Sequence, residues 1–160
     1  MTIIPLGEGV TNYTIAFGDS SDETETVQPG GSINHVYAEG TYEAIITANG
    51  LNGESTAITK EIIVSFQAPE NLMVTIENDT AVSRQVNVIA SADFALSYEV
   101  DFGQVGVDPI MSNIDETVSF IYDAAGTYTI TVTAFSAAID TATYTEEFIV
   151  TEILQPLVAA

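Results

Sequence analysis

Apolar and polar residues alternate along residues 127–134, and this is the clearest structural pattern in the chain. Tyr128, Ile130, Val132 and Ala134 fall on one face, and threonines stand between them. A period of two is typical of a β-strand with one face in a core and the other in water. Thr, Val, Ile and Tyr also suit such a pleated, half-buried surface.

The same pattern occurs upstream in residues 35–48, and both copies belong to a longer internal repeat. Residues 1–18 align with residues 86–103 at an offset of 85 without a gap. One residue is then inserted in the second copy, so residues 40–64 align at an offset of 86. A match of this length indicates one β-module written twice.

No segment has a helical period, and turn residues such as Pro29-Gly30-Gly31 separate short strand patterns. Many short strands at regular spacing predict a β-sandwich. We therefore expect an all-β protein with two tandem sandwiches. The expected strands lie near residues 2–4, 11–17, 32–37, 41–49 and 56–66 in the first copy, and near 72–77, 85–91, 96–103, 116–122, 127–135 and 142–151 in the second.

The repeat also predicts domain boundaries: a first domain over 1–66, a linker over 67–71, a second domain over 72–152 and the start of a further linker over 153–160. The linker is short and contains one proline, which predicts a limited hinge and an end-to-end arrangement.

The second copy opens with an additional strand at Leu72–Ile76 that has no counterpart in the first copy. The first module either begins inside a longer chain or borrows this strand from elsewhere. In both cases an incomplete sheet would leave an unpaired edge.

One charge interrupts the core-facing positions of the last strand in each copy: Lys60 in the first and Glu146 in the second share the parity of residues expected in the core. A charge is not buried without a partner. We expect either a β-bulge at these positions or a place at the rim of the sandwich.

The chain has a formal net charge of −21, with 23 acidic residues against two basic ones. Such a surface repels phosphate backbones and anionic lipid head groups, which argues against nucleic-acid binding. No cysteine is present, so disulfides, thiol catalysis and zinc–thiolate sites are excluded. No apolar run is long enough to cross a bilayer, so we expect no membrane insertion by this segment.

His35 is the only histidine, so a serine–histidine–acid device would have to use it. Its aligned residue is Phe120, and a position that accepts phenylalanine is expected to serve packing. Carboxylates abound, but no loop is long enough to form the walls of a cleft. We therefore expect no enzymatic activity.

An acidic loop contains Asp19, Asp22, Glu23 and Glu25, and oxygen-rich loops can bind calcium. The spacing does not match an EF-hand, and we expect Asp19 instead to cap the turn after Phe17-Gly18 through its side chain. No cofactor is expected, with calcium as the alternative and Asp19 and Asp101 as its candidate ligands.

Sugar binding by the modules themselves would need exposed aromatic rings. Most aromatic residues recur in both copies, as core residues do, and those without an aromatic counterpart include Phe94, Phe135 and Tyr144. These three are the candidate glycan-binding residues, and packing at strand ends is the alternative. There is no tryptophan to stack on a pyranose ring.

The segments Phe17-Gly18-Asp19 and His35-Val36-Tyr37-Ala38-Glu39-Gly40-Thr41-Tyr42 resemble the polycystic-kidney-disease (PKD) domain, an Ig-like β-sandwich. In the second copy, Asp101-Phe102-Gly103 and residues 125–132 carry the same resemblance, which covers nearly the whole chain. The departures are Gln104 in place of the Asp that follows Phe-Gly, Phe120 in place of the family His, and the lack of tryptophan in both copies.

The pair looks most like tandem PKD modules in surface glycan-binding proteins of marine Bacteroidetes, which take part in polysaccharide utilisation. The resemblance implies non-catalytic spacers that project a carbohydrate-binding domain from the cell. It also implies an extracellular, outer-membrane lipoprotein context, a monomer, and polysaccharide bound through neighbouring modules. The alternatives are modules that themselves bind polysaccharide or calcium, and a structural adhesin segment that acts through its exposed edge strand.

Overall fold

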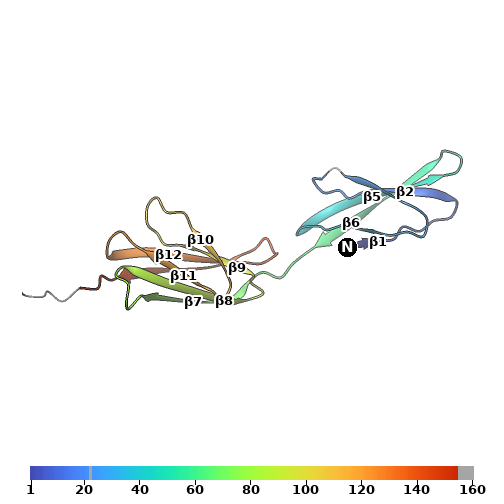
Figure 1. Cartoon of the computed structure of the whole chain (residues 1–160). Coiled ribbons are helices and arrows are strands. Elements are labelled where there is room, and N and C mark those ends of the chain that lie inside the picture. Colours follow the sequence, from blue (N-terminus) through green and yellow to red (C-terminus); the bar gives the residue numbers. More distant parts are fainter. Residues whose placement is uncertain (22, 155–160) are drawn as a thin grey trace, which may run out of the picture. The chain divides into compact units, whose positions relative to one another are not determined.

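The computed structural model describes residues 1–21 and 23–154, and all its regular elements are β-strands (Figure 1). The predicted all-β class is confirmed. Contacts divide the chain into unit 1, Met1–Ser65, and unit 2, Phe66–Ala160, beside the predicted linker at 67–71. Most of the linker predicted over 153–160 lies outside the described residues. Across the described ranges there is no helix with the length and apolar character needed to span a membrane.

Unit 2 consists of two facing antiparallel sheets. One sheet has the order β10-β9-β12-β13 and the other has the order β11-β8-β7. Figure 1 shows the two sheets as separate layers of unit 2. The strands are β7 (Glu70–Asn78), β8 (Gln85–Asp93), β9 (Ser97–Asp101), β10 (Ile110–Asn113), β11 (Thr117–Ile121), β12 (Gly126–Phe135) and β13 (Ala142–Val150).

The core of unit 2 lies between these sheets and is made of the alternate residues along the strands that face inward. Leu72, Val74 and Ile76 of β7 pack against one side of this core and cover it. Its fully or almost fully buried residues are Val86, Val88, Ala90, Tyr98, Val100, Phe102, Val118, Tyr122, Ile130, Val132, Ala134 and Val150.

Unit 1 repeats this plan with fewer strands. A four-stranded sheet has the order β3-β2-β5-β6, and a two-stranded sheet pairs β1 with β4. The core cluster is smaller and comprises Ile15, Phe17, Tyr37, Ala44 and Ile62. The strands are β1 (Thr2–Ile3), β2 (Val10–Ala16), β3 (Thr24–Val27), β4 (Ile33–Asn34), β5 (Gly40–Gly50) and β6 (Ser55–Val64).

The strand pairing of the two units follows the same offsets as their sequences. Thr2 pairs with Asn34 in unit 1, and Asn87 pairs with Ser119 in unit 2, 85 residues further on. Between β5 and β6 Gly40 pairs with Val64, whereas in unit 2 Gly126 pairs with Val150, at an offset of 86. The internal repeat is therefore a repeat of hydrogen-bond register.

The list of expected strands was incomplete. β3 and β10 were missed, because each has four residues and neither has the long apolar alternation of the other strands. Of the two alternatives for the charges in the last strands, the bulge is absent: Lys60 pairs regularly with Ala44, and Glu146 with Ile130. Both charges are exposed on β6 and β13, which are edge strands, so the rim is where they lie.

β1 is much shorter than β8, its counterpart, and proline explains where it stops. Pro5 occupies the position of Ala90 and has no N–H for a ladder hydrogen bond. In unit 2 the strand continues to Asp93, and β7 pairs along its outer side. Among the described residues no strand pairs with the corresponding side of β1.

A glycine after each core phenylalanine is required by geometry. Gly18 has φ +73° and Gly103 has φ +68°, a region that residues with a Cβ rarely adopt. A Cβ at these positions would lie 2.1 Å from the backbone oxygen of Glu43 and 2.3 Å from that of Thr129, respectively. The turn therefore approaches the neighbouring strand too closely for any side chain.

Gly103→Ala should destabilise unit 2 by more than about 3 kcal/mol, because it combines backbone strain with a clash against a strand that cannot retreat. Gly106→Ala is the matched control: its φ is +83°, but a Cβ there meets nothing within 4 Å. The control should lose only about 1 kcal/mol. Chemical denaturation of both variants measures the difference, and equal losses would contradict the close-approach argument.

Candidate functional site

The strongest polar cluster of unit 1 joins the loop after β2 to the residue after β4. His35 Nε2 lies 2.6 Å from Asp19 Oδ2, and both side chains are largely shielded from water. The imidazole ring stacks on Phe17, with ring centroids 3.8 Å apart and an interplanar angle of 4°. Asp19 Oδ1 accepts hydrogen bonds from the backbone N–H and the hydroxyl of Ser21.

Unit 2 makes the same join with different side chains. Phe120 occupies the place of His35 and stacks on Phe102, with centroids 4.8 Å apart. Gln104 occupies the place of Asp19, and its amide donates to Asp123 Oδ2 at 3.0 Å while its oxygen accepts from the Asp123 N–H at 3.0 Å. In unit 1 these contacts join the loop after β2 to the residue after β4. In unit 2 they join the loop after β9 to β11 and the segment after it. This is a structural use of the His–Asp pair.

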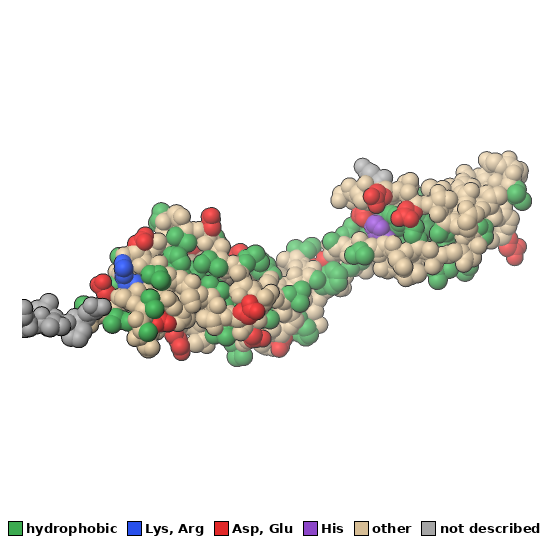
Figure 2. Space-filling view, in the orientation of Figure 1, with side chains coloured by type: hydrophobic (Ala, Val, Ile, Leu, Met, Phe, Trp, Pro, Cys, Tyr) green, Lys and Arg blue, Asp and Glu red, His purple; other side chains and the backbone are tan. Residues whose placement is uncertain are grey.

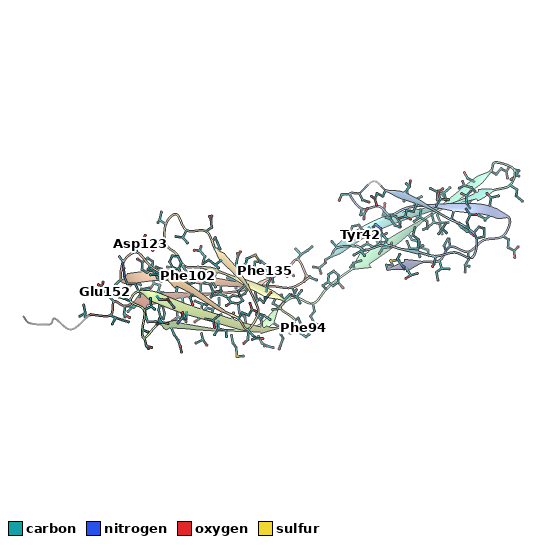
Figure 3. The ribbon with its side chains drawn as sticks, in the orientation of Figure 1. Tyr42, Phe94, Phe102, Asp123, Phe135 and Glu152 are labelled. Carbon is teal, nitrogen blue, oxygen red and sulfur yellow. The ribbon has the colours of Figure 1, made fainter. Side chains whose placement is uncertain are left out.

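Buried tyrosines close the same end of each unit. The Tyr37 hydroxyl donates to the Phe17 carbonyl at 3.1 Å, and the Tyr122 hydroxyl donates to the Phe102 carbonyl at 2.8 Å. Burial is the main cause that raises the pKa of both phenols, so they remain neutral donors. Tyr42, labelled in Figure 3, packs against Tyr37 and donates to the Ala38 carbonyl.

The electrostatics of the cluster are local. Hydrogen bonds from the Ser21 side chain, then from His35, lower the pKa of Asp19 below its ordinary value of 3.8. The Ser21 hydroxyl is bonded to Asp19 and not to His35, so the three residues do not form the serine–histidine–acid order of a hydrolase.

The two candidate calcium ligands belong to different units. Asp101 is exposed at the end of β9, and its Oδ1 accepts a 2.8 Å bond from the Gly103 N–H, a turn-capping role. Asp19 is held by Ser21 and His35, as described above, and Asp22 lies outside the described residues. In the ranges 1–21 and 23–154, no group of three or more His, Cys, Asp or Glu side chains converges as metal ligands would. Calcium binding stays a prediction.

The three candidate glycan-binding aromatics do not form one platform. Phe135 follows the buried Ala134, whereas Tyr144 pairs with the buried Val132, so the two rings lie on opposite faces of the sheet. The Tyr144 hydroxyl donates to the Glu146 carboxylate at 2.7 Å, which raises the pKa of the phenol. Phe94 is 52 % exposed in the turn between β8 and β9.

Phe94 and Phe135 lie toward the same end of unit 2 in Figure 3. Their segments are joined there by a 2.8 Å hydrogen bond from the Leu96 N–H to the Phe135 carbonyl. Phe94 is the ring most available to a ligand, and sugar binding by it stays a prediction.

The pairing of Asp19 with His35 was missed from the sequence, although the repeat contains a signal for it. Both residues change between the copies, to Gln104 and Phe120, and they change together. Two positions that change together across a repeat are expected to touch. The packing role predicted for His35 agrees with its stacking on Phe17.

Comparison with known proteins gives no family to which the chain can be assigned. No protein-family description matches it. No curated protein matches it either. The resemblance to PKD domains therefore rests on the residues quoted above.

His35→Phe should leave the stability of unit 1 within about 1 kcal/mol of the parent chain, because Phe120 performs the same stacking in unit 2. His35→Ala should cost about 2 kcal/mol, because the ring that covers Phe17 is removed. Thermal unfolding followed by circular dichroism compares the two variants. If the phenylalanine variant were as unstable as the alanine variant, the bond between His35 and Asp19, and not the stacking on Phe17, would account for the stability.

The Asp19 carboxyl should titrate below its ordinary value, and Ser21→Ala should raise its pKa more than His35→Phe does, because Ser21 is the larger cause. The depressed pKa stabilises unit 1 at pH values above the ordinary 3.8, and this contribution is lost as the pH falls through the folded value. Asp19→Asn should therefore differ from the parent chain at neutral pH and converge with it in acid. Carboxyl NMR titration and unfolding from pH 2.5 to 7 measure both effects, with Asp140→Asn as the loop-carboxylate control.

Proposed function

We propose that this segment is a pair of non-catalytic spacer modules in a cell-surface glycan-binding protein. One observation carries the proposal: the residues that both repeats keep serve packing or backbone hydrogen bonds. Tyr37 and Tyr122 bond to Phe17 and Phe102, and Gly18 and Gly103 permit the turns beside them. The chemistry-bearing residues, His35 and Asp19, are instead the ones that the second repeat replaces.

The character of the core and of the surface supports the same proposal. Every buried side chain among the described residues is apolar or a tyrosine, and no other polar or charged residue is buried. Catalytic groups need burial and neighbours that shift their pKa toward the working pH. Figure 2 shows acidic side chains scattered over the visible face rather than gathered around a hollow. A strongly acidic surface with dispersed charges favours solubility and disfavours non-specific association, which suits a module that separates two other domains.

The resemblance to tandem PKD modules supplies the setting of the proposal. In that setting the modules stand end to end between a lipid anchor and a carbohydrate-binding domain, outside the cell. The polysaccharide is bound by the neighbouring module, and this segment sets the distance and the limited hinge between anchor and ligand. No enzyme activity and no nucleic-acid partner are part of the proposal.

A second candidate is weak sugar binding by unit 2 itself, and one observation favours it. Phe94 has φ +62°, which is rare for a bulky aromatic residue, and the residue is 52 % exposed. Strained positions of this kind are over-represented at binding sites. A single exposed ring gives low affinity, because sugar sites combine stacking with several polar contacts.

Affinity electrophoresis in gels that contain soluble polysaccharides separates the two candidates. Under the spacer proposal the 160-residue chain migrates identically with and without polysaccharide. Retardation that Phe94→Ala abolishes, and that the exposed aliphatic control Ile121→Ala leaves intact, would favour binding by the module and overturn the spacer proposal.

Small-angle X-ray scattering measures the arrangement that a spacer requires. A single compact body of this length would have a radius of gyration of about 15 Å. Two units arranged end to end should give a clearly larger value and a long tail in the distance distribution. Inserting four prolines into the 67–71 segment should lengthen the particle further, whereas a compact radius in both chains would remove the spacer role.

A further inference from the structure

An apolar groove runs along the side of unit 1, between β1 and β6. Two adjoining hollows of about 380 and 310 Å³ form it. Ile3, Ile4, Ile46 and Lys60 line both hollows, and Ile58 and Ile62 extend the apolar lining along β6. The groove gives access to the core of unit 1, because Ile62 belongs to the core cluster and Ile3 and Ile46 pack against it.

The equivalent place in unit 2 is filled by a strand. β7 pairs antiparallel with β8, and Leu72, Val74 and Ile76 turn their side chains to the core. Asn78 closes the end of the strand against β13: its Nδ2 donates to the Ile149 carbonyl at 2.9 Å, and its Oδ1 accepts from the Thr151 N–H at 3.0 Å.

Residues that flank β1 are more exposed in unit 1 than their counterparts in unit 2, where β7 covers β8. Met1 is 58 % exposed, whereas its counterpart Val86 is completely buried. Ile4 is 60 % exposed, and its counterpart Ile89 is 36 % exposed. The Tyr98 hydroxyl reaches the Val88 carbonyl at 3.1 Å, whereas Tyr13 has only a 3.5 Å contact with the Gly7 carbonyl. Unit 1 is a sandwich with one strand position empty among its described residues.

We infer that this groove is a docking site for an extended β-strand with the chemistry of β7, supplied by a partner polypeptide. The inference goes beyond the spacer role, because it makes unit 1 a receptor for a partner segment. The ligand is an antiparallel strand with apolar side chains at three alternate positions, followed two residues later by an asparagine. Backbone hydrogen bonds give affinity in this mode of recognition, and the alternate side chains give specificity.

The repeat fixes the register of the bound strand. Ile76 pairs with Val88, so its equivalent in the ligand would lie opposite Ile3. The ligand asparagine would lie opposite Met1, as Asn78 lies opposite Val86, and would address the Ile63 carbonyl and the Ser65 N–H. Pro5 cannot donate to the ladder, so backbone pairing is concentrated on Met1–Ile4.

Charge distinguishes the ligand from a second copy of this chain. Two chains that each carry −21 repel one another, and the β7 of a second copy is already paired with its own β8. Lys60 lines the groove where unit 2 has Glu146. A ligand carboxylate that faces the groove would pair with this lysine, whereas Glu77 of β7 alternates with Ile76 and faces away from the core.

The test is a titration of the 160-residue chain with a fluorescein-labelled peptide of residues 68–80, at 150 mM salt to screen repulsion. Saturable binding with a dissociation constant of about 1–100 µM is expected. A control peptide with Leu72→Asn, Val74→Asn and Ile76→Asn should not bind. Absence of saturable binding of the parent peptide up to about 1 mM would overturn the inference.

Two exposed isoleucines of unit 1, Ile58 on β6 and Ile45 on β5, provide matched variants of the protein. Ile58→Asp puts a charge into the groove and should weaken binding by about tenfold or more, whereas Ile45→Asp, outside its lining, should change it less than about twofold. Equal effects would mean that the peptide binds elsewhere, for example by exchanging with β7 in unit 2, and would overturn the inference. A concentration-dependent dimer in light scattering that blocks peptide binding would do so in favour of a second copy.

A covalent version removes the dependence on affinity. Residues 70–85 placed directly before Met1 reproduce the connection that β7 has to β8, because Met1 aligns with Val86. This graft should raise the midpoint of thermal unfolding of unit 1 by about 5 °C or more and slow hydrogen exchange in β1. The same graft with the three asparagine substitutions should do neither, and equal behaviour of the two grafts would contradict the docking site.

Discussion

The hydrogen bond that joins a buried tyrosine hydroxyl to the carbonyl of the core phenylalanine is the constraint on which each unit depends. Tyr122 follows a strand of one sheet and Phe102 follows a strand of the other, so the bond fixes the two layers together. A buried carbonyl or hydroxyl without a partner costs about 1–3 kcal/mol, so neither group can be left alone. The carbonyl can be presented only if the next residue turns sharply, which is why Gly103 follows and why its φ is positive.

The same constraint explains how the two repeats can differ elsewhere. Once the tyrosine and the glycine are kept, the neighbouring join between loops can be made by an Asp–His pair or by Gln104 and Asp123. In both units a flat ring, His35 or Phe120, stacks on the core phenylalanine, and the polar atoms of the join are satisfied locally. The Asp–His pair of one repeat is thus replaced by a different set of side chains in the other. This replacement indicates that the pair supports the fold.

Sequence periodicity was sufficient to predict the class of fold and the long strands, because an alternation of Thr and Val residues is compatible only with a half-buried β-strand. It failed for β3 and β10, which have four residues each, too few for a recognisable alternation, and which pair with β2 and β9, respectively. The sequence singled out Phe94 as an aromatic residue without a counterpart in the other repeat, but its backbone conformation, with φ +62°, could not be predicted, because no pattern of apolar residues specifies it. The contact between Asp19 and His35 was encoded in the comparison of the repeats, but it needed both positions to be considered together.

The scarcity of basic residues has a consequence for resistance to proteolysis. Proteases of the trypsin type cut only after lysine or arginine, and this chain has one of each, Lys60 and Arg84. Lys60 is paired within β6, and the backbone of Arg84 is held on both sides, by the Thr151 carbonyl and the Tyr122 N–H. A protease must bind its substrate as a free extended strand, so neither bond is available without unfolding. The folded segment is therefore an unfavourable substrate for such enzymes.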